Sequence, residues 1–371
     1  MSARGIDPAL SPGMAQGPVG HDDRPILTLR GVYRNFTQPV DLLERLGNLA
    51  KRRGKPPSVQ AVADIDLDVI AGEVIGIVGE SGCGKSTLGR MIAGILPPTS
   101  GEIFYKGRPV SQLGAAARRD YELGVQMIFQ DPYSSLNPRM RVVDIIGEAP
   151  VVHGMVSRSG KEEYVAGLMH KVGLDPAYRF RYPHQFSGGQ RQRIGVARAL
   201  ALKPALIVCD EAVAALDVSI QAQVLNLFIQ LRRELGLTYF FISHNLGVVS
   251  HVADRVAIMY LGRIVEIADT DTIFGRANHP YTQALIKELP VLRTDQRQFD
   301  PIQGELPSPI DPPSGCPFHP RCPYAMDRCR IERPLLKAVG QGQQEYGLLD
   351  ARPNPHQSAC HLNDLIFMET R

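Results

Sequence analysis

The sequence predicts an α/β fold in which a largely parallel sheet is covered by helices on both faces. Short apolar runs typical of buried strands alternate with longer segments of helical periodicity, which is the pattern of parallel sheets. One strand leads directly into a glycine-rich loop and a helix, and beyond about residue 270 the chain becomes rich in proline and cysteine. We therefore expect a flexible leader over 1–25, an α/β domain over 26–270 and a smaller extension over 271–371.

Composition and charge exclude several classes of protein. The chain has 371 residues, of which 44% are hydrophobic, so it has enough apolar material to form a core. Its 41 basic and 38 acidic residues leave a net charge of +3, which is too small to indicate nucleic acid as a partner. No apolar run approaches the ~18 residues of a membrane span, and the N-terminus lacks the apolar core of a signal peptide. We expect a cytosolic protein whose six cysteines form no disulfide framework.

The elements of the α/β domain follow from the apolar pattern. Strands are expected at 26–29, 62–70, 74–78, 125–129, 206–209 and 239–242, with a hairpin over 256–267 that turns at Leu261 and Gly262. Helices are expected at 85–95, 189–202 and 220–235, and a mixed, mostly helical region lies between about 132 and 187. The basic segment 45–58 is interpreted as a solvated surface insertion, or alternatively as a contact with a membrane surface.

A glycine-rich loop carries the clearest chemical signal. Residues 79–86 read GESGCGKS and match the P-loop pattern G-x-x-x-x-G-K-[ST] in full, between a buried strand and a helix. Glycines allow backbone N–H groups to converge on phosphate oxygens, and the N-terminus of the helix adds a positive dipole end. Lys85 offers a charge for the β- and γ-phosphates, and Ser86 offers a hydroxyl ligand for Mg²⁺. The ATP-binding residues predicted in this segment are Gly79, Ser81, Gly82, Cys83, Gly84, Lys85, Ser86 and Thr87.

Two acidic residues follow the apolar run 206–209. Ligands collect at the carboxyl edge of a parallel sheet, so Asp210 and Glu211 are expected to reach the P-loop. Asp210 is predicted to hold Mg²⁺ through water. Glu211 is predicted to be the general base that polarises the attacking water.

A second loop indicates the kind of P-loop protein. Residues 186–190 read Phe-Ser-Gly-Gly-Gln before a helix, and here the sequence resembles the ATP-binding cassette (ABC) ATPases over roughly 26–270. The resemblance implies a RecA-like P-loop NTPase domain with an inserted helical subdomain, about 132–187, and a small Cys/Pro-rich C-terminal extension. It also implies roles for single residues. Gln130 would be the lid glutamine, which reaches magnesium together with Ser86 and Asp210, and His244 would be the switch histidine. Asp217 would belong to the D-loop, and Phe36, with Tyr33 as its alternate, would be the aromatic residue that stacks on adenine.

The same resemblance implies a dimer of cassettes. Ser187, Gly188, Gly189 and Gln190 would form a second anion site at a helix N-terminus, acting on the ATP of the partner. One chain cannot close both anion sites on the same phosphate, so the family binds two ATP molecules between two head-to-tail cassettes. Ala212 and Ala214 depart from the family pattern, which usually has Pro and Ser there. Because Glu211 and His244 remain, we expect a hydrolytic site and not a non-hydrolysing regulatory cassette.

The segments HPYTQAL (279–285), GELPSP (304–309) and GCPFHPRCP (315–323) look like the C-terminal extension of oligopeptide and dipeptide importer ATPases. Residues 130–138 and 190–193 resemble the second of two paralogous ATPase subunits in that family. The resemblance implies an ATP-hydrolysing motor that works with a sister ATPase, two transmembrane permeases and an extracytoplasmic binding protein, as a peripheral protein on the cytoplasmic face of the cell membrane. Related machines carry nickel, glutathione or other small solutes.

Four cysteines gather in the extension: Cys316, Cys322, Cys329 and Cys360. Thiolates with Pro and His nearby suit a soft metal centre, and the spacing lacks the C-x₂-C pairs of zinc ribbons. The family resemblance favours a [4Fe–4S] cluster, with zinc, or four buried or free thiols, as alternatives.

A function from another class is a soluble cassette protein acting on ribosomes or DNA. Such proteins usually carry two cassettes or a long coiled-coil insertion, and this chain has one cassette and no sustained heptads.

Overall fold

The computed structural model describes residues 24–37, 58–131, 133, 135–289, 304–339 and 355–363. The predicted leader up to residue 23 and the basic segment as far as residue 57 lie outside the described residues. Within the described ranges, no helix combines the length and apolar character that crossing a membrane requires.

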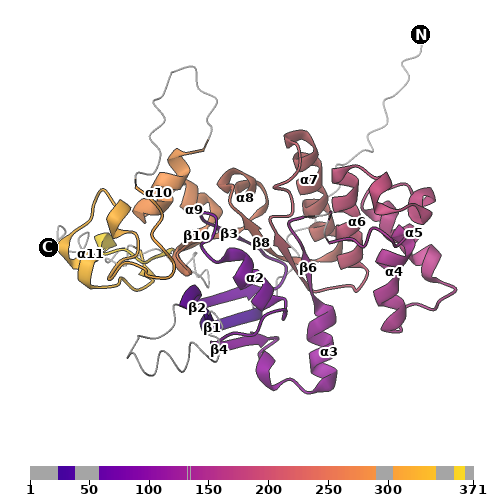
Figure 1. Ribbon diagram of the computed structural model, residues 1–371, viewed down its shortest axis with the longest axis horizontal. Helices are drawn as coiled ribbons and strands as arrows, with labels where there is room; N and C mark the ends of the chain where they lie inside the picture. Colours follow the sequence, from indigo (N-terminus) through magenta and orange to yellow (C-terminus); the bar gives the residue numbers. More distant parts are fainter. Residues whose placement is uncertain are drawn as a thin grey trace, which may run out of the picture.

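An eight-stranded sheet with the order β11-β12-β10-β9-β3-β8-β7-β6 forms the centre of the molecule (Figure 1). Five neighbouring strands are parallel: β6 (Val125–Ile128), β7 (Leu206–Asp210), β8 (Thr238–Ser243), β3 (Val74–Val78) and β9 (Arg255–Tyr260). β10 (Arg263–Asp269) pairs antiparallel with β9 through the expected turn, where Leu261 and Gly262 have φ of 43° and 81°. The predicted α/β fold with a largely parallel sheet is therefore confirmed.

Helices pack on both faces because successive side chains of each strand point to opposite sides. Ile75 and Ile77 belong to one hydrophobic cluster with Phe240, whereas Val74 and Val78 belong to the cluster on the other face. All of these side chains are buried. A parallel sheet covered on both faces explains why its strands are continuous apolar runs in the sequence.

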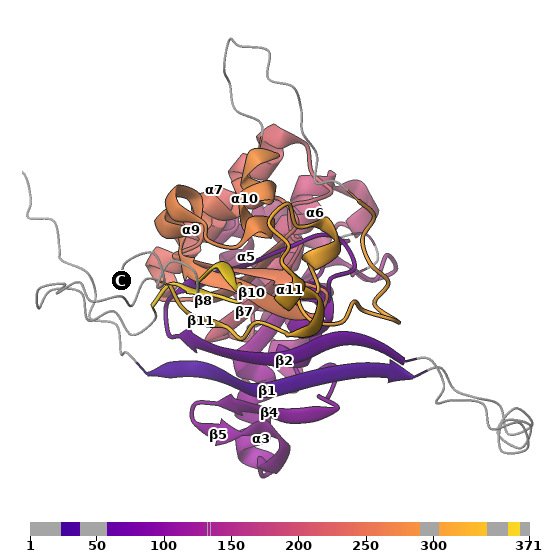
Figure 2. The same ribbon diagram turned by 90° about the vertical axis from the view of Figure 1, so that its left-hand side faces the viewer.

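A second, antiparallel sheet lies against the first cluster. Its order is β2 (Ser58–Ile70), β1 (Pro25–Thr37), β4 (Ser100–Tyr105) and β5 (Arg108–Pro109), and Figure 2 shows β2, β1 and β4 side by side. Helix α2 (Lys85–Ile92) contributes Leu88, Met91 and Ile92 to the cluster that both sheets share. The apolar pattern indicated only parts of β1 and β2 and did not indicate β4, whose first three residues stay exposed or half-exposed.

Helices α4 (Val142–Val152), α5 (Lys161–Lys171) and α6 (Gly188–Leu200) lie at one end of the molecule (Figure 1). The C-terminal segment with α10 (Pro280–Lys287) and α11 (Asp327–Ile331) lies at the other end. Two of its strands, β12 (Gln357–Ser358) and β11 (Lys337–Ala338), extend the central sheet beyond β10. The remaining helices are α3 (Ala115–Gly124), α7 (Val218–Leu235), α8 (Leu246–Val252) and α9 (Thr270–Arg276), with 3₁₀ turns at Val110–Gln112, Pro176–Phe180, Pro183–Gln185 and His319–Arg321.

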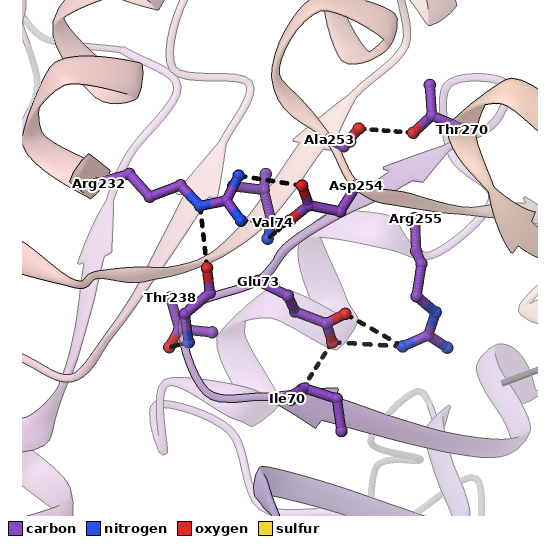
Figure 3. Close-up of polar contacts among 10 residues, drawn as sticks. Ile70, Glu73, Val74, Arg232, Thr238, Ala253, Asp254, Arg255 and Thr270 are labelled. Atoms are coloured by element: carbon purple, nitrogen blue, oxygen red, sulfur yellow. Dashed lines mark hydrogen bonds and ion pairs between the residues drawn. The ribbon is translucent and has the colours of Figure 1, made fainter. Parts of the chain in front are cut away.

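A polar network satisfies the backbone at the amino edge of the parallel sheet (Figure 3). Asp254 accepts a hydrogen bond from the Val74 N–H at 2.8 Å and pairs with Arg232 of α7, with 2.6 Å between Nη2 and Oδ2. Glu73 accepts from Arg255 Nη1 at 3.3 Å. Burial raises the pKa of Glu73, although Arg255 acts in the opposite direction. This edge is therefore tied together by its own side chains, and the glycine-rich loop lies at the other end of β3.

Candidate functional site

A cavity of about 340 Å³ opens where β3 and β7 end. Residues from four separate stretches of the chain line it: Val59, Ala61, Ser81, Gly82, Gly84, Lys85, Ser86, Thr87, Gln130 and Glu211. Most of the predicted nucleotide-binding residues thus surround one space. Val59 and Ala61 of β2 are additions, because the sequence offers no polar or glycine signal at those positions.

The glycine-rich loop has a backbone that only glycine adopts readily. Gly82 has φ of +82° and Gly84 has φ of +105°. A Cβ on Gly79 would collide with the carbonyl oxygen of Met259, and one on Gly84 with that of Ala61. The loop is therefore packed against neighbouring backbone on one side and open to the cavity on the other, as a phosphate cradle requires.

Lys85 begins α2 and is buried, with 4% of its surface exposed. Its Nζ donates to the carbonyl oxygens of Gly79 at 2.8 Å and Glu80 at 2.9 Å. Cys83 is also buried, and its Sγ lies 3.8 Å from the same Nζ. Backbone carbonyls hold the ammonium group at the lining of the cavity, next to the N-terminus of α2, where an anion is favoured.

Asp210 ends β7 and accepts a hydrogen bond from Ser86 Oγ at 2.7 Å. Burial raises the pKa of Asp210, while the Ser86 hydroxyl acts to lower it. A hydroxyl and a carboxylate side by side are oxygen ligands of the kind that Mg²⁺ takes together with waters and phosphate oxygens. The residues present therefore fit a magnesium ion that is bound jointly with a nucleotide.

Glu211 lies between Gln130 and His244. Its Oε2 accepts a hydrogen bond from Gln130 Nε2 at 2.7 Å, and its Oε1 lies 3.2 Å from His244 Nδ1. Glu211 has φ of +46°, and its N–H donates to the carbonyl oxygen of Ile242 at 3.0 Å. A left-handed backbone at a non-glycine residue costs ~1–3 kcal/mol and is typical of functional sites. The carboxylate can therefore be oriented by two neighbours, as a base acting on a water molecule would need.

The Ser-Gly-Gly-Gln segment 187–190, called the signature loop below, lies outside the cavity. Ser187 caps α6 in a capping box: its Oγ accepts from the Gln190 N–H at 3.3 Å, and its N–H donates to Gln190 Oε1 at 3.0 Å. Gly189 has no room for a side chain because Ile220 of α7 packs against it. Exposed Asp217 stands at the N-cap position of α7 without a capping hydrogen bond to its side chain, and Gly188 approaches Leu216 beside it. Neither these four residues nor Asp217 line the cavity at this chain's own phosphate loop.

Of the two candidate adenine-stacking residues, Phe36 lies nearer the cavity. It pairs across β1 and β2 with Val59, a lining residue, but it is not itself part of the lining. Phe36 is partly exposed, and the Arg34 guanidinium lies 4.8 Å from its ring centroid. Tyr33 instead faces Asp64 and Arg263, which line a different cavity.

The four cysteines of the extension line one small, enclosed cavity together with His319 and His361. Burial raises the pKa of Cys316 to about 11 and of Cys360 to about 12, so both thiols stay protonated at neutral pH. In the part of the chain that the structure describes, no three His, Cys, Asp or Glu side chains are arranged to hold a metal ion. The cysteines converge as predicted, but their arrangement does not support the predicted metal centre.

Comparison with known proteins supplies independent information. Residues 62–214 match the family model described as "ABC transporter", and residues 265–329 match "Oligopeptide/dipeptide transporter, C-terminal region". The probable peptide ABC transporter ATP-binding protein y4tS of Sinorhizobium fredii is 51% identical over 77% of this chain and 82% of its own length. The oligopeptide transport ATP-binding protein AppF of Bacillus subtilis is 46% identical over 91% of this chain and 97% of its own.

Among solved structures, cbiO1 of Clostridium perfringens, part of an ABC transporter complex, superposes with a TM-score of 0.56. The match covers 68% of this chain and 92% of that chain at 24% sequence identity. This likeness bears on the fold of the cassette alone.

Proposed function

Because this chain belongs to the family of ABC transporter ATP-binding proteins of oligopeptide and dipeptide transport, we propose that it is the ATP-hydrolysing subunit of a membrane importer of di- and oligopeptides. One observation carries the proposal: the phosphate loop, Asp210 and the Gln130–Glu211–His244 set meet at the edge of one cavity. This arrangement combines an anion cradle, an oxygen site for magnesium and an oriented carboxylate.

In the proposed reaction the polar residues in and beside the cavity have separate roles. The loop N–H groups and Lys85 would bind the phosphates, while Ser86 and Asp210, with Gln130, would hold magnesium, which would neutralise phosphate charge. Glu211 accepts the proton of the attacking water, and His244 keeps the carboxylate in line. Phe36 stacks on adenine from the rim.

Hydrolysis in this proposal requires a second cassette. The surface of Ser187, Gly188, Gly189, Gln190 and Asp217 would close over the ATP of the partner, because it is separate from this chain's own cavity. We propose a sister ATPase as that partner, two permeases as the membrane part, and an extracytoplasmic binding protein as the source of peptide. The chain would then act at the cytoplasmic face of the cell membrane.

The importer is tested by affinity purification of the tagged chain from gently solubilised native membranes, followed by mass spectrometry. Recovery of two permeases, a sister ATPase and a binding protein supports the proposal, and the ligand retained by the binding protein identifies the solute. A peptide supports peptide import, whereas nickel or glutathione would change the substrate and keep the machine. Recovery of the chain alone, or with ribosomes, would contradict the transport function.

The [4Fe–4S] cluster, with zinc as its alternative, stays a prediction of the family resemblance. The four cysteines line one shared cavity, but no three His, Cys, Asp or Glu side chains of the described residues are arranged to hold a metal ion. Anaerobic purification with iron, sulfide and zinc assays tests it, and a folded protein without metal would overturn it.

A further inference from the structure

The C-terminal segment contacts the phosphate loop at Glu80. Arg321 donates from Nη1 to Glu80 Oε2 at 2.8 Å and from Nη2 to Oε1 at 2.9 Å, which makes a bidentate ion pair. The N–H of Glu80 donates to the hydroxyl oxygen of Tyr281 at 3.0 Å. Arg321 and Tyr281 follow Glu80 by 241 and 201 residues, so the contact joins segments that are far apart in the sequence.

This contact is well packed. The Arg321 side chain is 6% exposed and that of Glu80 is 23% exposed, so water screens the pair less than it screens a surface ion pair. Burial of the guanidinium is the largest single influence and acts to lower its pKa, but the hydrogen bonds and charge of Glu80 and Tyr260 together outweigh it and raise the pKa of Arg321. Behind the pair, the ring of Tyr281 lies 4.7 Å from that of Tyr260 and 5.4 Å from that of Phe318.

Glu80 also contacts the phosphate-binding lysine. Its carbonyl oxygen accepts from Lys85 Nζ at 2.9 Å, while its N–H and carboxylate are bound to the C-terminal segment. A carboxylate in a loop that receives a triphosphate opposes binding unless its charge is neutralised. The guanidinium of Arg321 supplies that neutralising charge and at the same time fixes the loop.

We propose that Arg321, supported by Tyr281, is a positioning residue for the phosphate loop, which makes ATP affinity depend on the C-terminal extension. The inference rests on the proposed function of the cavity as an ATP site. Arg321 acts through Glu80 and touches no nucleotide, so its contribution disappears when the Glu80 carboxylate is removed.

A double-mutant cycle on the full-length protein tests this dependence. The dissociation constant for ATP is measured by calorimetry, with Mg²⁺ chelated to prevent turnover, for Arg321→Gln, Glu80→Gln and the double variant. We expect Arg321→Gln to weaken binding about tenfold, because it leaves an unpaired carboxylate in the loop. Glu80→Gln should weaken binding about threefold, and the double variant should match Glu80→Gln. A role limited to general stability would not produce this rescue.

The controls separate this inference from the ATP site itself. Arg328→Gln removes an exposed ion pair with Glu332 in the same extension and should leave ATP affinity unchanged. Lys85→Ala should weaken binding in every background, and a wild-type chain that binds no ATP would overturn the proposed function first. If the wild-type chain binds ATP, two results would overturn the positioning role. One is wild-type ATP affinity in Arg321→Gln, and the other is an equal loss of ATP affinity in Arg321→Gln and in the double variant. If Arg321→Gln does not fold, Arg321→Lys replaces it, because lysine keeps the charge without the bidentate geometry. Its ATP affinity should be intermediate, and wild-type ATP affinity would refute the inference.

Discussion

Gly84→Ala places a methyl group at the tightest point of the phosphate loop. Gly84 has φ of +105°, and its added Cβ would overlap the carbonyl oxygen of Ala61 in β2 and lie 3.0 Å from Met259 Cε. The matched control is Gly82→Ala in the same loop, where φ is +82° and nothing lies within 4 Å of the added Cβ. Both variants place alanine at a positive φ, which costs free energy, but only in Gly84→Ala does the added Cβ overlap neighbouring atoms.

The expected magnitudes follow from these two terms. A left-handed backbone at alanine costs ~1–2 kcal/mol, which is the whole expected loss of unfolding free energy for Gly82→Ala. Overlap with packed backbone adds ~1–3 kcal/mol, so Gly84→Ala should lose about 4 kcal/mol in total. Against a typical stability of ~5–15 kcal/mol, the difference between the variants is measurable.

Urea unfolding of the nucleotide-free protein measures both losses. Because the chain contains no tryptophan, far-UV circular dichroism is the suitable signal. Calorimetric titration with ATP on the same samples should show weaker binding for Gly84→Ala. The loop backbone must shift to avoid the overlap with Ala61, and it then departs from its phosphate-binding conformation. Equal unfolding free energies for Gly82→Ala and Gly84→Ala would refute the claim that β2 confines the loop.

Three further predictions concern charge and protonation. Lys85→Ala removes the ammonium group at the cavity lining and should weaken ATP binding about 10–100-fold; unchanged affinity in calorimetry would contradict the phosphate-cradle assignment. Glu211→Gln keeps a side chain of the same shape that can still form hydrogen bonds, but it removes the base. ATPase turnover in the assembled complex should therefore fall about 10²–10⁴-fold, while ATP stays bound and the cassette dimer stays closed. Normal turnover would mean that Glu211 is not the base or that the sister site does the hydrolysis. Burial lowers the pKa of His279 from 6.5 to about 4, so the unfolded chain takes up its proton first as pH falls, and up to ~3 kcal/mol of stability should be lost between pH 6.5 and 4. His279→Asn keeps an acceptor for the Tyr281 N–H and should flatten that acid limb in unfolding measured against pH, and an unchanged slope would show that another group titrates there.

Local patterns were sufficient to identify the chemistry. The phosphate loop, the two acids at the end of β7 and the signature loop are each contiguous, and their backbone conformations depend on glycines, strand ends and a capped helix. The five parallel strands were equally visible, because a sheet buried on both faces consists of continuous apolar runs. Burial of alternate side chains in two separate clusters is the physical reason for that pattern.

The antiparallel sheet was only partly predictable. β4 pairs with β1 but leaves its first half exposed, so its sequence lacks the apolar run that marks a strand. The extension likewise gave no sign that β12, a strand of two residues, would pair with β10 of the cassette. Pairing partners at such separations depend on the packed core and not on local propensity.

The sequence by itself determined the fold class of the cassette and most residues around its cavity. Tertiary structure decided how those residues meet. Glu211 lies between Gln130 and His244, and its left-handed backbone could not be predicted from any motif. It also decided that Arg321, in a proline-rich segment without any signal for nucleotide binding, holds Glu80 of the phosphate loop. The reason is physical: a motif records what the backbone needs within a few residues, whereas a salt bridge across 241 positions exists only once both segments are packed against the same sheet.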